Sequence, residues 1–237
     1  LNSSTACFWM KQVSYGKGTT AANRNHPDPA RAAFQFAGTP LQSLPVFEVV
    51  GGATAAARIS TLAAQRATWT DGSKFRACAE HVLAGVPDFQ RFLEAGWVEY
   101  DRLTRRMVYL QEELDWAVYV SAGLVSKDAA DVRLDQDMEA NLGQRPFERT
   151  RGYDDGVSLR VKGAASRTDF PVHAPAHWRA REALLGGEAI GTLEAREYKR
   201  MWRESEQNVD PRAYRENLVK EWLRRFVADT FEAQFTA

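Results

Sequence analysis

The residues that could perform chemistry in this sequence are few and scattered. Cys7 lies in a short apolar run, which favours a small buried side chain over a reactive thiolate. His173 and His177 are four residues apart, but Pro175 stands between them and no acid or cysteine adjoins them. Because protein zinc sites need three or four closely spaced ligands, we predict no metal site.

Three carboxylates, Glu112, Glu113 and Asp115, form the densest group of acids that could act as proton donors or acceptors. They fall within a segment that has the pattern of an amphipathic helix. Charged residues on such a helix usually face solvent. We therefore interpret this acidic group as a solvated helix face rather than a carboxylate site.

Motifs for common enzymatic chemistry are absent from the sequence. There is no G-x-G-x-x-G, P-loop or H-E-x-x-H motif and no G-x-S-x-G nucleophile turn. We expect no catalytic residue, and no cofactor bound by this chain.

The bulk composition is that of an ordinary globular protein with one or two domains. The 237 residues contain 44% hydrophobic and 26% charged residues, and 31 basic residues balance 31 acidic ones. A net charge of zero argues against a freestanding nucleic-acid-binding protein. Two distant cysteines and the lack of a secretory signal or a membrane-length apolar run predict a cytoplasmic protein without a membrane contact. Because the first residue is Leu, we expect a longer reading frame.

Basic and amide side chains are concentrated near the start of the chain. Residues 1–47 contain four basic residues and one acid, Asp28, a net charge of +3. Lysine and arginine suit phosphate contacts, whereas asparagine and glutamine suit base edges. The candidate DNA contacts are Lys11, Lys17, Arg24 and Arg31 for phosphates, and Gln12, Asn23 and Asn25 for bases. By composition alone, a solvated loop is the commoner explanation of this region.

The clearest predicted element is a helix with one apolar stripe. Its apolar positions follow one another at spacings of three and four, and Gly123 supplies a left-handed cap after it. The stripe consists of Tyr100, Leu103, Met107, Leu110, Leu114 and Ala117. Further helices are predicted over 53–68, 178–185 and 193–202 and from Pro211 onward, where the proline suits a first helical turn. Residues 143–175 are predicted to form a loop.

Residues 1–50 are predicted to form short strands and loops. The apolar run 6–10 is interpreted as a strand that Lys11 and Gln12 follow, and 34–36 alternates as an edge strand does. The fold class is therefore predicted to be α+β, mainly α. A strand-and-loop part at 1–50 precedes a helical spacer at 51–125 and a mixed, mainly helical part at 126–237.

Several segments, in order along the chain, resemble large bacterial adenine-specific DNA methyltransferases of the BREX phage-growth-limitation type and related restriction–modification methylases with an Eco57I-like catalytic domain. The segment 1–13, LNSSTACFWMKQV, resembles a stretch that follows the catalytic domain in that family. Further matches are FQFAGTPLQSLP at 34–45, RMVYLQEELDW at 106–116, LGQRPFE at 142–148, PAHW at 175–178 and IGTLEAREYKRMW at 190–202. Residues 74–96 and 152–170 depart from the family pattern.

The resemblance implies a carboxy-terminal fragment that contributes DNA target recognition and a helical scaffold. The parent family uses S-adenosylmethionine, held by a glycine-rich turn, and an Asn/Asp-Pro-Pro-aromatic loop that grips a flipped adenine. The Asp-Pro pairs here, at 28–29 and 210–211, do not continue into Pro-aromatic. The implied partners are double-stranded DNA, a missing amino-terminal catalytic domain and other phage-defence subunits. This chain alone is expected to be inactive.

An alternative interpretation treats the chain as a helical protein–protein interaction module of a defence complex. The stripe at 100–117 could then be a coiled-coil seam, although its heptads stop after about three. A self-contained enzyme of another class has no motif to support it. For the segment 198–202 we predict only a packed helix end.

Overall fold

The computed structural model of the chain describes residues 3–16, 34–35, 38–71, 73–74, 78–151, 174–200, 202 and 211–235. Five of the candidate DNA contacts, Lys17, Asn23, Arg24, Asn25 and Arg31, lie outside the described residues, as does His173.

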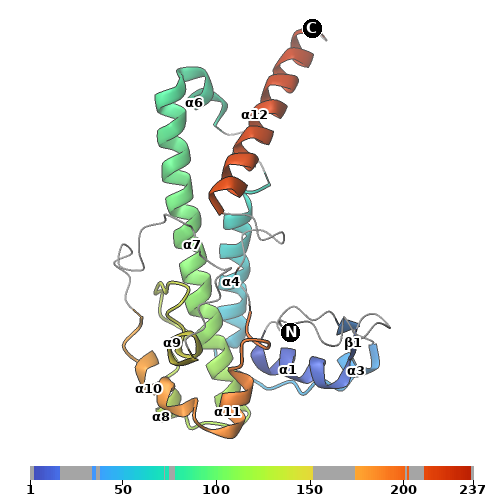
Figure 1. Cartoon of the computed structure of the whole chain (residues 1–237), viewed down its shortest axis with the longest axis vertical. Helices are drawn as coiled ribbons and strands as arrows, with labels where there is room; N and C mark the ends of the chain where they lie inside the picture. Colours follow the sequence, from blue (N-terminus) through green and yellow to red (C-terminus); the bar gives the residue numbers. More distant parts are fainter. Residues whose placement is uncertain are drawn as a thin grey trace.

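One long helix, α7 (Val86–Ser121), runs through most of the length of the molecule (Figure 1). The helix begins after Gly85, which has a φ of 114°, a backbone conformation that glycine adopts readily. Pro87 lies in its first turn. At the other end Gly123 has a φ of 70°, and the Leu124 amide donates to the carbonyl of Tyr119. This is the predicted glycine cap, and it ends the helix sharply.

The predicted apolar stripe of α7 is confirmed as its core face. Tyr100, Leu103, Met107 and Leu110 are buried, and several of them pack against Leu62 of α4 (Gly52–Ala67). In Figure 1, α4 lies alongside α7. Burial of these side chains supplies the main stabilisation of the helix pair, since each contributes about 1.5–3 kcal/mol relative to exposure. The helix predicted over 53–68 is therefore confirmed as well.

The amino-terminal half of α7 is held by apolar and aromatic contacts. Here α6 (Ala79–Ala84) and α12 (Pro211–Phe235) pack against it, and the ring of Trp222 stacks on Trp97 with centroids 6.2 Å apart. At Gly96 a Cβ atom would come within 2.1 Å of Trp69, so only glycine fits this approach. The outer end of α12 extends beyond α6 and α7 (Figure 1).

Short helices surround the carboxy-terminal half of α7. They are α8 (Lys127–Ala130), α9 (Pro146–Arg151), α10 (Trp178–Leu184) and α11 (Glu188–Leu193). The predicted helix at 178–185 is confirmed. The predicted helix at 193–202 is wrong, because α11 ends at Leu193 and the chain continues in turns. Part of the stretch predicted as a loop forms α9 instead.

The predicted α+β class is wrong, because the described part of residues 1–50 is mainly helical. Residues 6–10, predicted as a strand, lie inside α1 (Ser4–Val13), and α3 (Gly38–Gln42) follows later. Between them β1 (Tyr15–Gly16) and β2 (Phe34–Gln35) pair as two antiparallel residues each, too short to form a sheet layer. The Ser3 side chain accepts a hydrogen bond from the Ala6 amide and caps α1. A five-residue apolar run does not itself distinguish a strand from a buried helix turn.

Side chains from all three predicted segments, 1–50, 51–125 and 126–237, meet in one buried region, and the boundaries between these segments stay predictions. No helix in the described part of the chain combines the length and apolar character needed to cross a bilayer.

Candidate functional site

The acidic group on α7 is buried, and its interpretation as a solvated helix face is wrong. Glu112, Glu113 and Asp115 are at most 1% exposed. They lie where α7 is covered by α1, α10 and the segment 194–200, so each carboxylate meets a side chain from elsewhere in the sequence. A buried charge is costly unless it is paired and hydrogen-bonded. The partners of these three carboxylates therefore define the site.

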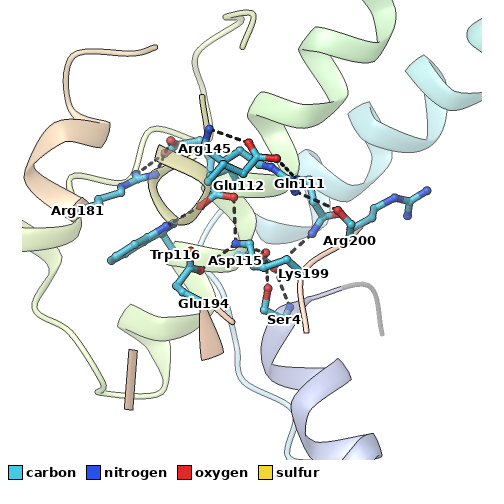
Figure 2. A network of polar contacts seen from close by, with 12 residues as sticks. Ser4, Gln111, Glu112, Asp115, Trp116, Arg145, Arg181, Glu194, Lys199 and Arg200 are labelled. Carbon is cyan, nitrogen blue, oxygen red and sulfur yellow. Dashed lines mark hydrogen bonds and ion pairs between the residues drawn. The ribbon is translucent and has the colours of Figure 1, made fainter. Parts of the chain in front are cut away.

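The first part of the site, the Lys199 cluster, comprises Lys199, Glu112, Asp115 and Glu194. The ammonium of Lys199 lies 3.0 Å from Glu112 Oε2, 3.0 Å from Asp115 Oδ2 and 2.8 Å from Glu194 Oε1. Each of these four side chains is at most 2% exposed. Figure 2 shows Lys199 at the centre of this group. Three carboxylates thus share one ammonium away from water.

Neutral donors supply the remaining hydrogen bonds of this cluster. The amide and the hydroxyl of Ser4, at the start of α1, donate to the two oxygens of Asp115 at 2.9 and 2.7 Å. The Trp116 indole donates to Glu112 Oε1 at 2.9 Å, and the Tyr119 hydroxyl donates to Glu194 Oε1 at 2.7 Å. Through these contacts α1 is attached directly to α7.

The Lys199 cluster has three carboxylates and one ammonium, and this imbalance shifts the pKa values of Glu112 and Lys199. Burial raises the pKa of Glu112 to about 7, against the opposing charge of Lys199 and with help from the charges of Glu194 and Asp115. Burial alone would lower the pKa of Lys199, but the three carboxylates raise it above its usual range. Lys199 is therefore a permanent cation, whereas Glu112 is the group that titrates near neutral pH.

The second part of the site, the Glu113 cluster, has one carboxylate and several donors. Arg181 forms a two-pronged pair with Glu113, with both N–O distances at 2.8 Å. The Trp178 indole donates to Oε1 at 2.6 Å, and His177 Nε2 lies 2.9 Å from the same atom. The backbone amide of Arg133 donates to Oε2 at 2.7 Å. This cluster attaches α10 to α7.

The hydrogen-bond donors around Glu113 lower its pKa by more than burial raises it. Burial alone would raise the pKa of Glu113, but hydrogen bonds from His177, Arg181 and Trp178 and the charge of Arg181 lower it to about 2. Glu113 thus stays ionised at every physiological pH. Arg181 is itself fully buried, and its Nε donates to the carbonyl of Ala130 at 2.7 Å.

The backbone that carries Lys199 is held by a further ion pair. Arg145 pairs with Glu148 at 2.6 Å and also donates to the carbonyl of Arg200 at 3.0 Å. Glu148 in turn accepts from the amides of Gly143 and Arg145. The segment 194–200 is therefore attached on both sides. The prediction that 198–202 is packed is confirmed for Lys199 and Trp202, but 198–200 lie in turns and irregular structure beyond α11 rather than at a helix end.

The chemistry open to this network is limited by its burial. Its carboxylates and ammonium are at most 2% exposed, so a substrate in solution cannot reach them. The network joins α1, α7, α10 and the segment 194–200 through charged hydrogen bonds. Its role is to fix the relative positions of these segments.

The candidate DNA contacts that the structure describes are Lys11 and Gln12, and both engage the neighbouring segment. Lys11 Nζ donates to the carbonyl of Glu197 and lies 5.6 Å from the centre of the Tyr198 ring. Gln12 is exposed, and its side chain hydrogen-bonds Tyr198. They are neighbours on the last turns of α1. Their assignment to DNA stays a prediction.

The two other reactive residues considered from the sequence have structural surroundings. Burial raises the pKa of the Cys7 thiol, against the lowering effect of Lys11. His177 belongs to the Glu113 cluster, so it does have an acidic partner that its sequence neighbours did not reveal. Within the described residues, no group of three or more His, Cys, Asp or Glu side chains is arranged to hold a metal ion.

Sequence reasoning missed Lys199, Arg181 and Glu194 as members of the site. One usable signal was the spacing of the three acids Glu112, Glu113 and Asp115, which fall within four residues. On a helix that is covered on most sides, three such positions cannot all face solvent. Another was the position of Lys199 between the aromatic residues Tyr198 and Trp202. The pairing of the α7 carboxylates with His177, Arg181 and Lys199 depends on contacts 64 or more residues apart, which no local pattern contains.

Comparison with known proteins places this chain beside a methyltransferase. It is 31% identical, over 94% of its length, to the adenine-specific methyltransferase PglX of Streptomyces coelicolor. The chain spans 19% of the length of that protein. No family model and no solved structure matches the chain. The chain is therefore related to an adenine-specific methyltransferase, in one part of that protein's length.

Proposed function

We propose that this chain is a carboxy-terminal portion of a site-specific adenine-N6 DNA methyltransferase that serves phage defence of the BREX type or restriction–modification. Its contribution is DNA target recognition and scaffold, and the methyl-transfer site belongs to another part of the longer protein. The observation that carries this proposal is the 31% identity to an adenine-specific methyltransferase across 94% of the chain, which corresponds to 19% of that relative.

The division of labour within the longer protein follows from what this chain contains. The sequence has neither the glycine-rich donor motif nor the Asn/Asp-Pro-Pro-aromatic motif, so S-adenosylmethionine and the flipped adenine are bound elsewhere. What the chain supplies is a rigid helical body whose segments are joined by the buried network. A rigid scaffold of this kind can hold DNA-contacting side chains in register with a catalytic domain.

The basic amino-terminal region is proposed to contact the DNA backbone. Replacing Lys11, Lys17, Arg24 and Arg31 with alanine should reduce the salt dependence of DNA binding, by up to about one unit of log–log slope per lost phosphate contact. Gln12, Asn23 and Asn25 are proposed for base edges. An unchanged slope in the quadruple variant, measured by fluorescence anisotropy on duplex DNA, would remove this assignment.

The test of the proposed function is the source DNA upstream of the Leu1 codon. We expect an in-frame extension that encodes the glycine-rich donor motif and the Asn-Pro-Pro-aromatic motif. A separate catalytic subunit encoded nearby would require a two-chain enzyme instead. If neither the extension nor such a gene carries those motifs, the proposed function is wrong.

The alternative of a protein–protein interaction module was based on the stripe at 100–117. Most of that stripe is buried within this chain against α4 and its neighbours. It is therefore not available as a coiled-coil seam, and we do not carry this alternative further.

A further inference from the structure

An apolar cavity lies between α1 and α11, beside the irregular segment 44–49. The two helices contact one another near the lower end of the molecule in Figure 1. The volume of the cavity is about 520 Å³, which is in the range of cavities that bind ligands and is large enough for several apolar side chains. Most of its lining is apolar and consists of Phe8, Trp9, Pro45, Leu124, Ala189 and Leu193.

The floor of the cavity is held in place by the core of the protein. Phe8 and Leu193 both pack in the buried cluster that contains Trp116 of α7. The ring of Phe8 also meets Tyr198 edge-on, with centroids 5.1 Å apart. The start of α1 is fixed as well, because Ser4 is hydrogen-bonded to the buried Asp115. The cavity is therefore preformed, which lowers the entropic cost of filling it.

The rim of the cavity extends its apolar surface into solvent. Pro45, Leu124 and Ala189 are exposed, and Val46, next to Pro45, is 88% exposed. Leu41 is a further exposed apolar side chain at the start of the same segment. Exposed apolar side chains that adjoin an apolar cavity mark an interaction site. A small molecule inside the cavity would leave Val46 in water, whereas a protein surface would cover both.

Backbone and side-chain donors around the cavity also fit a polypeptide. The segment 44–49 contains neither helix nor strand, and the amides of 46–49 form no hydrogen bond to a described residue. On the lining, Trp9 Nε1 and Thr5 Oγ1 are buried and have no hydrogen-bond partner in the described part of the chain. Such unpaired groups indicate that the packing around α1 is incomplete in this chain alone. A polypeptide supplies carbonyl acceptors together with apolar side chains.

Glu188 lies on the rim and constrains the charge of the occupant. Its side chain is exposed, and its carboxylate forms no ion pair among the described residues. Covering a carboxylate with another surface is costly unless an opposite charge meets it. The occupant therefore needs a lysine or arginine opposite Glu188.

We propose that this cavity and its rim, the α1–α11 surface, are the docking site for the part of the longer protein that precedes this chain. The choice of occupant rests on the proposed function. This chain corresponds to 19% of the related methyltransferase, so most of a protein of that length lies outside it. In the proposed carboxy-terminal position, the preceding polypeptide joins just before α1, which is one wall of the cavity.

Docking at the α1–α11 surface gives the two parts of the longer protein a fixed relative position. The preceding part inserts apolar side chains between α1 and α11 and places a basic side chain at Glu188. Because α1 also carries Lys11 and Gln12, this contact sets the distance between the proposed DNA contacts and the methyl-transfer site.

The first experiment compares hydrogen–deuterium exchange in the 237-residue chain and in the longer protein encoded by its reading frame. The amides of 46–49 should exchange at least about tenfold more slowly in the longer protein, because the docked part shields them from water. Equal exchange of these amides in the two proteins would overturn the docking surface. This comparison needs no variant.

A charged variant of the longer protein links the protection to the cavity. V46E/A189E places two carboxylates on the exposed rim, where neither side chain contributes to the core. The amides of 46–49 should then exchange as fast as in the 237-residue chain. The matched control, V98E/A228E, makes the same two changes at exposed positions of α7 and α12 and should keep the protection. Protection that persists in a folded V46E/A189E protein, or that both variants lose, would overturn the surface.

Two other occupants are outcomes of the same measurements. If a second copy covers the surface, the 237-residue chain forms a dimer in light scattering and its 46–49 amides are already protected. If a small molecule fills the cavity, mass spectrometry of the denatured longer protein detects it while the 46–49 amides exchange freely. Either result would overturn docking of the preceding part.

The docking surface and the proposed function can fail separately. If the longer protein methylates DNA but its 46–49 amides are unprotected, the surface is wrong and the proposed function stands. If those amides are protected by a preceding part that has no methyl-transfer motifs, the surface stands and the proposed function is wrong. A reading frame without any preceding part would overturn the docking surface.

Discussion

Two neighbouring glutamates on α7, Glu112 and Glu113, are equally buried and have opposite acid–base behaviour. Glu112 shares one ammonium with two further carboxylates, and its pKa is raised to about 7. Glu113 has its own guanidinium and further hydrogen-bond donors, and its pKa is lowered to about 2. Burial is common to both. The balance of donors to carboxylates in each cluster therefore decides the outcome.

The difference has a consequence for stability. In the Glu113 cluster the hydrogen-bond donors match the carboxylate, and their attraction to it increases when Glu113 ionises. Ionisation of Glu112 instead adds a negative charge to the Lys199 cluster, where two other carboxylates already share one ammonium. Removal of one partner from a buried ion pair leaves an uncompensated charge, which costs more than the pair itself contributes. The two clusters should therefore respond in opposite ways to pH and to charge removal.

The largest expected effect is that of Lys199→Met, which removes the only ammonium from three buried carboxylates. We expect the free energy of unfolding to fall by about 3–5 kcal/mol at pH 7, as measured by urea denaturation. Lys220→Met on the exposed face of α12 is the control and should change it by less than about 0.5 kcal/mol. A loss from Lys199→Met no larger than that of the control would mean that the cluster contributes nothing to stability.

Glu113→Gln should lower the free energy of unfolding by about 3 kcal/mol at pH 7. The pKa of Glu113 is shifted from 4.5 to about 2, and each pKa unit is worth about 1.4 kcal/mol. Because the folded-state pKa is depressed, this stability is present above pH 4.5 and is lost as pH falls toward 2. The difference in the free energy of unfolding between the parent chain and the variant should accordingly become smaller as pH falls from 4.5 toward 2. Glu94→Gln, on the exposed part of α7, is the control. A difference that stays constant from pH 7 to pH 2 would contradict the assignment.

Glu112→Gln should have the opposite pH dependence. The folded-state pKa of Glu112 is raised, so its contribution to stability is fully present below pH 4.5 and is lost as pH rises through about 7. Glutamine keeps an oxygen that accepts from Trp116 and carries no charge. We expect the variant's advantage over the parent chain to grow from almost nothing at pH 4.5 to about 3 kcal/mol above pH 7, at about 1.4 kcal/mol per pKa unit. Denaturation curves at several pH values measure this, and a variant that loses stability throughout would show that Glu112 is needed as an anion.

His177→Gln should have the smallest effect of the four. It removes one of several donors to Glu113 and leaves the two-pronged pair with Arg181 intact. A loss of about 1–2 kcal/mol is expected, close to that of one charge-assisted hydrogen bond in a buried site. His81→Gln is the comparison variant: it removes a histidine that contacts Asp88 at 2.6 Å in a half-exposed position, where the loss should be smaller. An effect as large as that of Glu113→Gln would mean that His177, rather than Arg181, is the main partner.

Local sequence patterns were sufficient for the long helices and insufficient for the site. The stripe from Tyr100 to Ala117, the cap at Gly123 and the first-turn position of Pro211 are local, and the structure confirms them. The strand predicted over 6–10 was wrong because a short apolar run fits both the two-residue period of a strand and the 3.6-residue period of a helix. The Ser3 cap and packing on α7 and α11 select the helix.

The buried network could not be predicted because its partners are distant in the chain. Ser4 and Asp115 are 111 residues apart, and Lys199 lies 84 residues after Asp115. A run of acids on a helix usually faces solvent, and only tertiary contacts reveal the exception.

The central proposal is that this chain is part of an adenine-specific methyltransferase whose methyl-transfer site lies in another part of the longer protein. The most direct measurement follows tritiated methyl groups from S-adenosylmethionine into duplex DNA, with the 237-residue chain alone and with the longer protein encoded by its reading frame. We predict no transfer by the chain alone and N6-methyladenine at one defined DNA site with the longer protein. Methyl transfer by the chain alone, or none by the longer protein, would contradict the account.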